Sequence, residues 1–333
     1  MSDFLSLQNA IASDSILNEV VVVNHISSRN ISTEKLRIVV FNIERGFGIE
    51  PLLIYLREHP LLKNTDVILA NEVDWGMKRT ENRNIAALIA EKNGFNYAYG
   101  IEFAYLKTPD SENKEGLHGN VIFSRLPILE SKVIRLPSVY NWQHSEQPRS
   151  GSRNAVCAAV EWNGKKIGLS SAHLENRTTP DGRLKQMKCL LEGVEAFFGN
   201  IPVIIGGDMN TNCMNGADNN EAPMLARNPA EQKRRIREVE KIEPLLLYAA
   251  QHGFDYTCCN LIDKTTRRKP IQGEKDLLLN LDWFFARGCT GTNPHVITAI
   301  FDENKLGTKN KYAEWQGTQI SDHDAIVADF CVF

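Results

Sequence analysis

The stretch Val203 to Asn212 reads VIIGGDMNTN, and it contains the two features that organise the rest of the chain. Apolar, strand-forming residues come first, two glycines follow, and the segment then reaches Asp208 and Asn210. A strand this apolar belongs in a core, where a carboxylate is costly unless something pairs with its charge. The stretch therefore predicts a buried strand that ends in a turn, a hydrogen-bond hub, or a metal or phosphate site.

Other strand-length apolar runs recur from Leu36 onward, and most of them end or begin on polar residues. These runs are LRIVVFNIE with Asn42 and Glu44, DVILANEVD with Glu72, LSSAHLEN with His173 and Asn176, LDWFFA with Asp282, and SDHDAIVADF with Asp322 and His323. Each polar end taken alone is an ordinary cap or turn. Six such segments in one chain are hard to attribute to turns.

The connections between these runs predict mixed sheets. Asn163-Gly164 separates two strand-like runs and favours a tight hairpin, whereas other runs are separated by segments with helical periodicity. The fold class is therefore α/β (α+β), with mixed sheets covered by helices. We expect residues 36–333 to form a single domain and residues 1–35 to be an N-terminal extension of uncertain role.

Composition limits the class of protein. The chain has 333 residues, a formal net charge of −3 and 42% hydrophobic residues, which is ordinary for a globular protein. The near-neutral charge argues weakly against non-specific nucleic-acid binding. Seven cysteines without a CxxC pair predict reduced thiols and a cytoplasmic protein. No signal peptide, transmembrane segment or stable protein partner is evident.

A shared rim of the sheet would gather several carboxylates from the strand ends. Such like charges repel unless a cation neutralises them. Oxygen ligands without cysteine favour Mg²⁺, with Mn²⁺ as the alternative ion. Gly206 and Gly207 suggest close backbone approach beside a phosphate.

The order of these motifs resembles that of the endonuclease/exonuclease/phosphatase (DNase I-like) superfamily. The resemblance rests on FNIE, NE after DVILA, GNVIFSRLPI, SAHLEN, GGDMN, LDWFF and SDHDAIV, and it covers roughly residues 36–333. It implies a four-layer sandwich in which two mixed β-sheets pack face to face with helices outside. It also implies metal-assisted hydrolysis of a phosphate ester.

The resemblance assigns roles to individual residues. The metal-binding positions are Asn42, Glu44, Glu72 and Asp322. The catalytic positions are His173, Asp208, Asn210, Asp282 and His323. The substrate-binding positions are Asn176, Arg153 and Asn120. In these roles, Glu72 binds the ion, Asp208 and Asn210 orient or deprotonate the attacking water, and Asp282 holds the ring of His323 against the phosphate.

The substrate stays open at this stage. A phosphodiester is favoured over a monoester, and nucleic acid, nucleotide and lipid headgroup all fit. Basic residues near the predicted rim (Arg149, Arg153, Arg177 and Arg183) and in the loop 264–269 suit a polyanion. The alternatives are a catalytically inactive relative that acts as a binding module, and a cation-binding structural protein.

Overall fold

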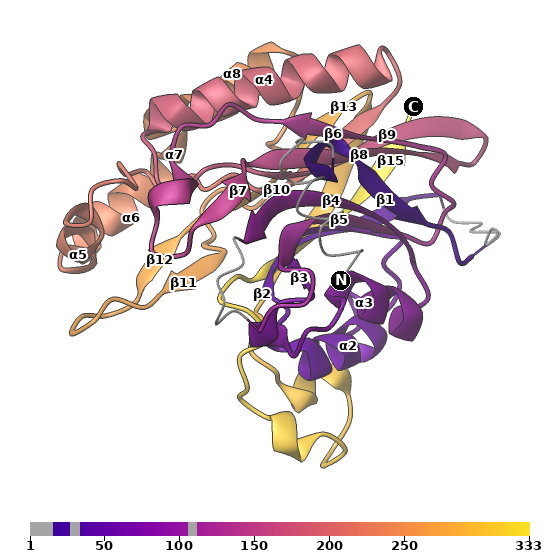
Figure 1. Ribbon diagram of the computed structural model, residues 1–333, viewed down its shortest axis with the longest axis horizontal. Coiled ribbons are helices and arrows are strands. Elements are labelled where there is room, and N and C mark those ends of the chain that lie inside the picture. Colours follow the sequence, from indigo (N-terminus) through magenta and orange to yellow (C-terminus); the bar gives the residue numbers. More distant parts are fainter. Residues whose placement is uncertain (1–15, 27–33, 106–111) are drawn as a thin grey trace.

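The computed structural model has two β-sheets packed face to face, with helices on both outer sides (Figure 1). It describes residues 16–26, 34–105 and 112–333. Each sheet contains both parallel and antiparallel pairs. The predicted four-layer sandwich of mixed sheets is therefore confirmed.

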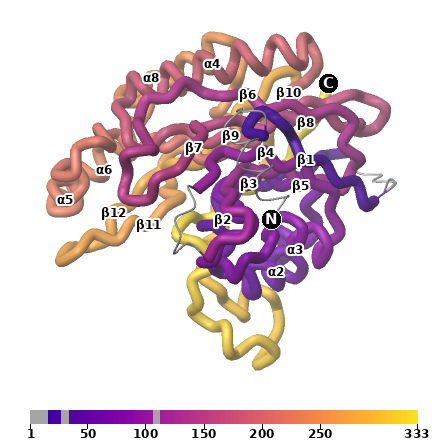
Figure 2. Tube along the Cα trace, viewed as in Figure 1, coloured from indigo at the N-terminus to yellow at the C-terminus, as the bar shows by residue number. Residues whose placement is uncertain are grey.

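The first sheet has the strand order β1-β4-β5-β3-β2-β15-β14, with β7 paired to β4. Its strands are β1 (Val20–Val23), β2 (Leu36–Arg45), β3 (Val67–Trp75), β4 (Asn96–Tyr105), β5 (Leu117–Ser124), β7 (Arg149–Gly151), β14 (Cys289–Ile297) and β15 (Ala325–Val332). The last strand, β15, pairs antiparallel with β2 in this sheet. Figure 2 traces the chain from the indigo N-terminal part to the yellow C-terminal part.

Part of the predicted N-terminal extension belongs to the first sheet. Val20–Val23 forms the edge strand β1 and pairs antiparallel with β4. The domain boundary at residue 36 therefore does not coincide with the start of the sheet. Residues 1–15 and 27–33 of the predicted extension lie outside the described residues.

The second sheet has the strand order β13-β10-β9-β8-β6. Its strands are β6 (Glu130–Arg135), β8 (Asn154–Trp162), β9 (Lys165–His173), β10 (Val203–Asp208) and β13 (Asp282–Arg287). The predicted hairpin joins β8 to β9, with φ of 49° at Asn163 and 77° at Gly164. A separate ribbon pairs β11 (Arg267–Lys269) with β12 (Leu277–Leu279).

Helices cover the outer face of each sheet. Buried side chains of α2 (Ile49–Glu58) and α3 (Ile85–Asn93) pack on the first sheet, and those of α4 (Pro180–Phe198) and α8 (Pro244–Gln251) pack on the second. The other helices are α5 (Glu221–Ala226), α6 (Pro229–Arg237) and α7 (Val239–Ile242). The helices within the described part of the chain are all too short or too polar to cross a membrane.

The glycines of the opening stretch lie in close contact with neighbouring strands. A Cβ atom at Gly206 would lie 2.3 Å from Cγ2 of Val40 in the facing sheet. At Gly207, where φ is 146°, it would lie 1.9 Å from the carbonyl oxygen of Ala172 on β9. Protein atoms fill the space that these glycines leave. The expectation that Gly206 and Gly207 make room for a phosphate is therefore wrong. Their role is to let β10 pack between neighbouring strands.

Arg183 does not lie at the rim, contrary to the sequence-based expectation. Its side chain is fully buried on α4 and donates to Glu243 over 2.6 Å and to the carbonyl oxygen of Met214 over 3.0 Å. Glu243 in turn accepts from the backbone N–H of Cys213 over 2.8 Å. This buried pair anchors the loop after β10 to the helical layer.

We predict that Arg183→Met lowers the free energy of unfolding by about 3–5 kcal/mol, because it leaves the carboxylate of Glu243 buried without its partner. The measurement is urea unfolding followed by circular dichroism. The double variant Arg183→Met/Glu243→Gln should recover part of the loss, since no uncompensated charge remains. Strictly additive losses in the double variant would contradict this account.

Candidate active site

Strand register brings polar side chains of both sheets into adjacent positions. In the second sheet, Asp208 on β10 pairs with His173 on β9 and with Asp282 on β13. In the first sheet, Asn42 on β2 pairs with Asn71 on β3. Neighbouring strands lie about 4.8 Å apart, so residues in register are close neighbours. The predicted rim is therefore two short rows of polar residues, one from each sheet.

The register of the first sheet shifts at four places, and three of these shifts contain an acidic residue; the fourth, between Thr292 and His295, contains none. The three shifts fall between Asn42 and Arg45, between Ala70 and Val73, and between Ile101 and Phe103. Glu44, Glu72 and Glu102 lie within these intervals. Such bulges re-aim a side chain that regular alternation would place elsewhere. Glu44 and Glu72 also have positive φ angles of 46° and 55°, which are uncommon outside glycine and often occur at functional sites.

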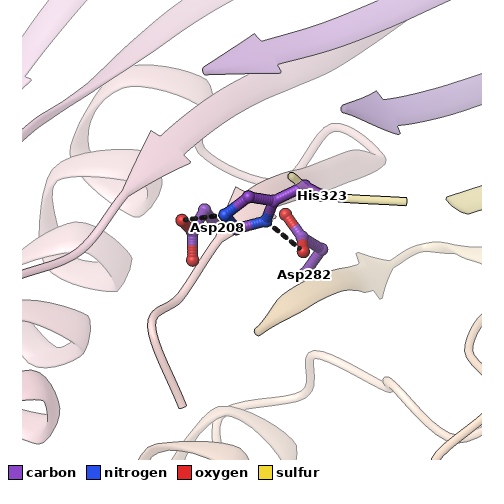
Figure 3. Close-up of side chains that lie close together, drawn as sticks. All are labelled: Asp208, Asp282 and His323. Atoms are coloured by element: carbon purple, nitrogen blue, oxygen red, sulfur yellow. Dashed lines mark hydrogen bonds and ion pairs between the residues drawn. The ribbon is translucent and has the colours of Figure 1, made fainter. Parts of the chain in front are cut away.

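His323 lies between two carboxylates (Figure 3). Its Nδ1 is 2.9 Å from Oδ2 of Asp282, and its Nε2 is 3.7 Å from Oδ2 of Asp208. Burial alone would lower the pKa of His323, but the charges of Asp282 and Asp208 outweigh it and raise the pKa to about 9. The ring is therefore an imidazolium at neutral pH, as the predicted phosphate contact requires.

His173 repeats this arrangement on the other side of Asp208. Its Nδ1 is 3.2 Å from Oε2 of Glu102, and its Nε2 is 3.5 Å from Oδ2 of Asp208. Burial and the nearby Arg153 lower the pKa of His173, but Glu102 and Asp208 outweigh them and raise it to about 9. Two buried imidazolium rings thus lie against one carboxylate.

Asp208 is held on all sides. Its backbone N–H donates to Oδ1 of Asn71 over 2.8 Å, and its carboxylate accepts from Nδ2 of Asn42 over 3.1 Å and from the backbone N–H of Asn210 over 2.9 Å. Burial would raise the pKa of Asp208, but the charges of His323 and His173 outweigh it and lower the pKa to about 2. The side chain is therefore an ionised acceptor in a fixed orientation.

Glu72 has the properties of a metal ligand that lacks a close protein partner. Its carboxylate is half-buried, yet its contacts are long: 3.4 Å to Nδ2 of Asn42 and 3.9 Å to Nε of Arg45. Burial would raise the pKa of Glu72, but nearby cations, with Arg45 first, hold it well below its usual value. A charged carboxylate beside a carboxamide fits a hard divalent cation.

Glu44 and Asp322 lie side by side next to this position. Oε2 of Glu44 accepts from the backbone N–H of Asp322 over 2.9 Å and from Gln319 over 3.1 Å. Oδ2 of Asp322 is 2.6 Å from Nη2 of Arg267. One oxygen of each acid is thus already used by the protein, so these two residues fit the edge of a metal site better than its centre.

A second group of potential ligands consists of Asp208, Asp282 and His323, whose ligand atoms all lie within 4.8 Å of one another. In this group, Nδ1 of His323 is already hydrogen-bonded to Asp282. A cation here would have to displace the proton that holds the imidazolium between two acids. We therefore interpret this group as a proton-handling unit.

The predicted substrate-binding residues fall into two settings. Asn176 and Asn210 line an open cleft of about 350 Å³. Arg153 is buried beneath it, where it donates to Glu102 over 3.0 Å and to Asn176 over 3.3 Å. Asn120 lies deeper still. It is fully buried, with its amide groups engaged by Asn71 over 2.9 Å and by Asn154 over 2.6 Å, which places it behind the site.

Sequence reasoning missed Glu102 as a member of the site, and it placed Asn71 at a strand end without giving it a role. Glu102 pairs with His173, and Asn71 fixes the backbone of Asp208. The signal for Glu102 was an isolated acid inside the apolar strand NYAYGIEFAY, where an unpaired charge is costly. For Asn71, the resemblance assigned a role only to the adjacent Glu72.

The sandwich of two mixed sheets with a buried acid–histidine rim defines the class of fold as α/β. A family model described as the Endonuclease/Exonuclease/phosphatase family matches residues 39–323. The chain belongs to that family, and the predicted resemblance is confirmed. Members of the family are generally hydrolases that act on phosphoester bonds and use divalent metal ions.

Solved structures with low sequence identity share this fold. An endonuclease/exonuclease/phosphatase from Beutenbergia cavernae is 18% identical with a TM-score of 0.55, over 90% of this chain and 72% of that one. The human Nocturnin catalytic domain with bound sulfate is 16% identical with a TM-score of 0.53, over 94% and 97%. D. rerio TDP2 complexed with a single-strand DNA product is 16% identical with a TM-score of 0.51, over 90% and 99%. None of the curated proteins matches the chain significantly.

We predict that Asp282→Asn lowers the pKa of His323 from about 9 by about one to three units, because the ring loses its closest opposite charge. Histidine resonances followed by NMR between pH 5 and pH 10 in EDTA measure this shift. The resonance of the exposed His252 serves as an internal reference. An unaltered His323 titration would show that Asp282 does not hold the imidazolium.

Proposed function

We propose that the protein is a Mg²⁺-dependent phosphodiesterase, with Mn²⁺ as the alternative ion, that directs in-line attack of water on a phosphate ester. The observation that carries the proposal is the position of Asp208. This ionised acceptor lies 3.5 Å from the imidazolium of His173 and 3.7 Å from that of His323. A proton acceptor flanked by two cationic donors is what hydrolysis of an anionic ester needs.

Each residue of the site has one task in this proposal. Asp208 accepts the proton of the attacking water, and Asn210, whose Nδ2 donates to the carbonyl oxygen of Leu174 over 2.9 Å, orients that water. His323 donates to a phosphate oxygen as negative charge builds up in the transition state. Asp282 keeps the His323 ring protonated and correctly turned.

His173 contacts the same phosphate from the side opposite His323. A divalent cation held by Glu72 and Asn42, with Glu44 and Asp322 beside it, would supply further positive charge to the phosphate oxygens. Asn176 faces the cleft through which a substrate enters. The substrate class within this proposal is a nucleic acid, a nucleotide or a lipid headgroup. The seven free thiols suit a reducing compartment, so we propose that the protein acts in the cytoplasm.

Hydrolysis of bis-p-nitrophenyl phosphate tests the proposal directly. We expect activity with Mg²⁺ or Mn²⁺ and its loss in EDTA. Asp208→Asn and His323→Gln should each lower kcat at least about 10²-fold, the scale of losing a catalytic base or a charged donor. His252→Gln, which replaces an exposed histidine far from the site, is the matched control and should retain activity.

Two results would contradict the proposal. Complete inactivity of the folded wild-type protein on this ester, on DNA, RNA and nucleotides, and on sphingomyelin would favour a binding module. Wild-type activity in the Asp208→Asn and His323→Gln variants would contradict the roles assigned to Asp208 and His323.

A further inference from the structure

The cleft of about 350 Å³ extends from the catalytic rim between three segments of the chain. These are the loop after β9 with Asn176 and Arg177, the residues after β10 from Asn210 to Asp218, and the ribbon of β11 and β12. In Figure 1 the ribbon projects from the body of the domain below α6. The cleft is at the lower end of the volumes that enclose small-molecule ligands, and it matches one nucleotide-sized group.

The inner end of the cleft is continuous with the catalytic site. Asn176 and Asn210 line it there, and so does Arg267, whose guanidinium is 2.6 Å from Asp322. This ion pair neutralises Arg267. A separate β-bridge between Arg267 and His323 connects the backbone of β11 to the loop that carries His323. A phosphate ester bound at the rim therefore has its remaining groups directed along the ribbon.

Farther along, the cleft contains two cations that no carboxylate neutralises among the described residues. Lys269 is half-buried, and no described acceptor lies within hydrogen-bond or ion-pair distance of its ammonium group. Arg177 donates to the neutral hydroxyl of Tyr140 over 3.2 Å and stacks near that ring, so its charge is retained. Burial lowers the pKa of Lys269, and the positive charges of Arg267 and Arg177 lower it further. Lys269 is thus close enough to Arg177 and to the ion-paired Arg267 for their positive charges to act on it.

The spacing of these cations is set by the strand. Arg267 and Lys269 are two residues apart on β11, so their side chains lie on the same face. Two residues of a strand span roughly 7 Å. Because Arg267 forms a β-bridge with His323, Lys269 lies about this far along the strand from the border of the rim, a distance that one sugar ring with its two ester oxygens can bridge.

The rest of the cleft wall suits an uncharged group. Its apolar residues are Met214, Ala222, Pro223, Ile271, Leu279 and Leu281. Carboxamides of Asn212, Asn215, Asn219 and Gln272 add donors and acceptors. Asp218 is the only carboxylate residue that lines the cleft within the described chain, and its Oδ1 caps the backbone N–H of Asn220.

We propose that Lys269 and Arg177 form a second anion subsite, and that the substrate is a small phosphoester with a second phosphate group one sugar ring away from the ester that is cleaved. This inference rests on the proposed phosphodiesterase function and specifies its substrate. Nucleoside bisphosphates and sugar bisphosphates share this chemistry, and the apolar wall favours the nucleoside.

The test compares p-nitrophenyl esters of thymidine 5′-phosphate with and without a 3′-phosphate, together with the regioisomeric pair esterified at the 3′-phosphate. For at least one pair, wild-type kcat/KM should be at least about tenfold higher for the ester that carries the second phosphate, the scale of a charge-assisted contact. Lys269→Gln should reduce this ratio to nearly one. Lys275→Gln, an exposed lysine on the same ribbon, should leave the ratio unchanged.

A binding measurement separates this inference from the proposed function. Calorimetry with the Asp208→Asn variant would compare thymidine 3′,5′-bisphosphate, thymidine 5′-phosphate, thymidine 3′-phosphate and glucose 1,6-bisphosphate. The bisphosphates should bind at least about tenfold more tightly than the monophosphates, and tighter binding of the nucleoside bisphosphate than of the sugar bisphosphate identifies the nucleoside as the source. Equal affinity of mono- and bisphosphates, or affinities unchanged by Lys269→Gln, would overturn the subsite even where ester hydrolysis is intact.

Discussion

The alternation of buried opposite charges is the constraint on which the site depends. Asp282, His323, Asp208, His173 and Glu102 form a line in which neighbouring atoms lie 2.9, 3.7, 3.5 and 3.2 Å apart. Each carboxylate keeps its neighbouring imidazole protonated, and each imidazolium allows its neighbouring carboxylate to stay ionised in the core. Removal of one member would weaken the charge pairing of its neighbours, although Glu102 would keep Arg153 and Asp208 would keep one of its two histidines.

The two sheets supply this line from opposite directions. His173, Asp208 and Asp282 come from adjacent strands of the second sheet in register, whereas Glu102 comes from a bulge in the first sheet. The glycines of β10 let the sheets pack closely enough for these charges to meet. The core between the sheets therefore serves the chemistry by holding the rim at a fixed width.

The strand ends could be predicted from the sequence, because an apolar run that stops on an acid has few physical explanations. The approach of Asp208 to His323 and Asp282 followed from that pattern and from the family resemblance. The position of Glu102 in the site could not be predicted, because a bulge breaks the alternation from which the sheet face of each side chain is inferred. The burial of Arg183 could not be predicted, since the sequence does not show that Glu243 lies opposite it, and the same holds for the contact of Asn120 with Asn154.

The central claim is that the cation lies beside Glu72 and the proton-handling unit lies at Asp208, Asp282 and His323. Crystals soaked in Mn²⁺ would test it most directly through anomalous scattering. The account predicts an anomalous peak within ligand distance of Glu72 and Asn42, and its loss in Glu72→Gln. A peak between Asp282 and His323 instead, with none beside Glu72, would contradict it.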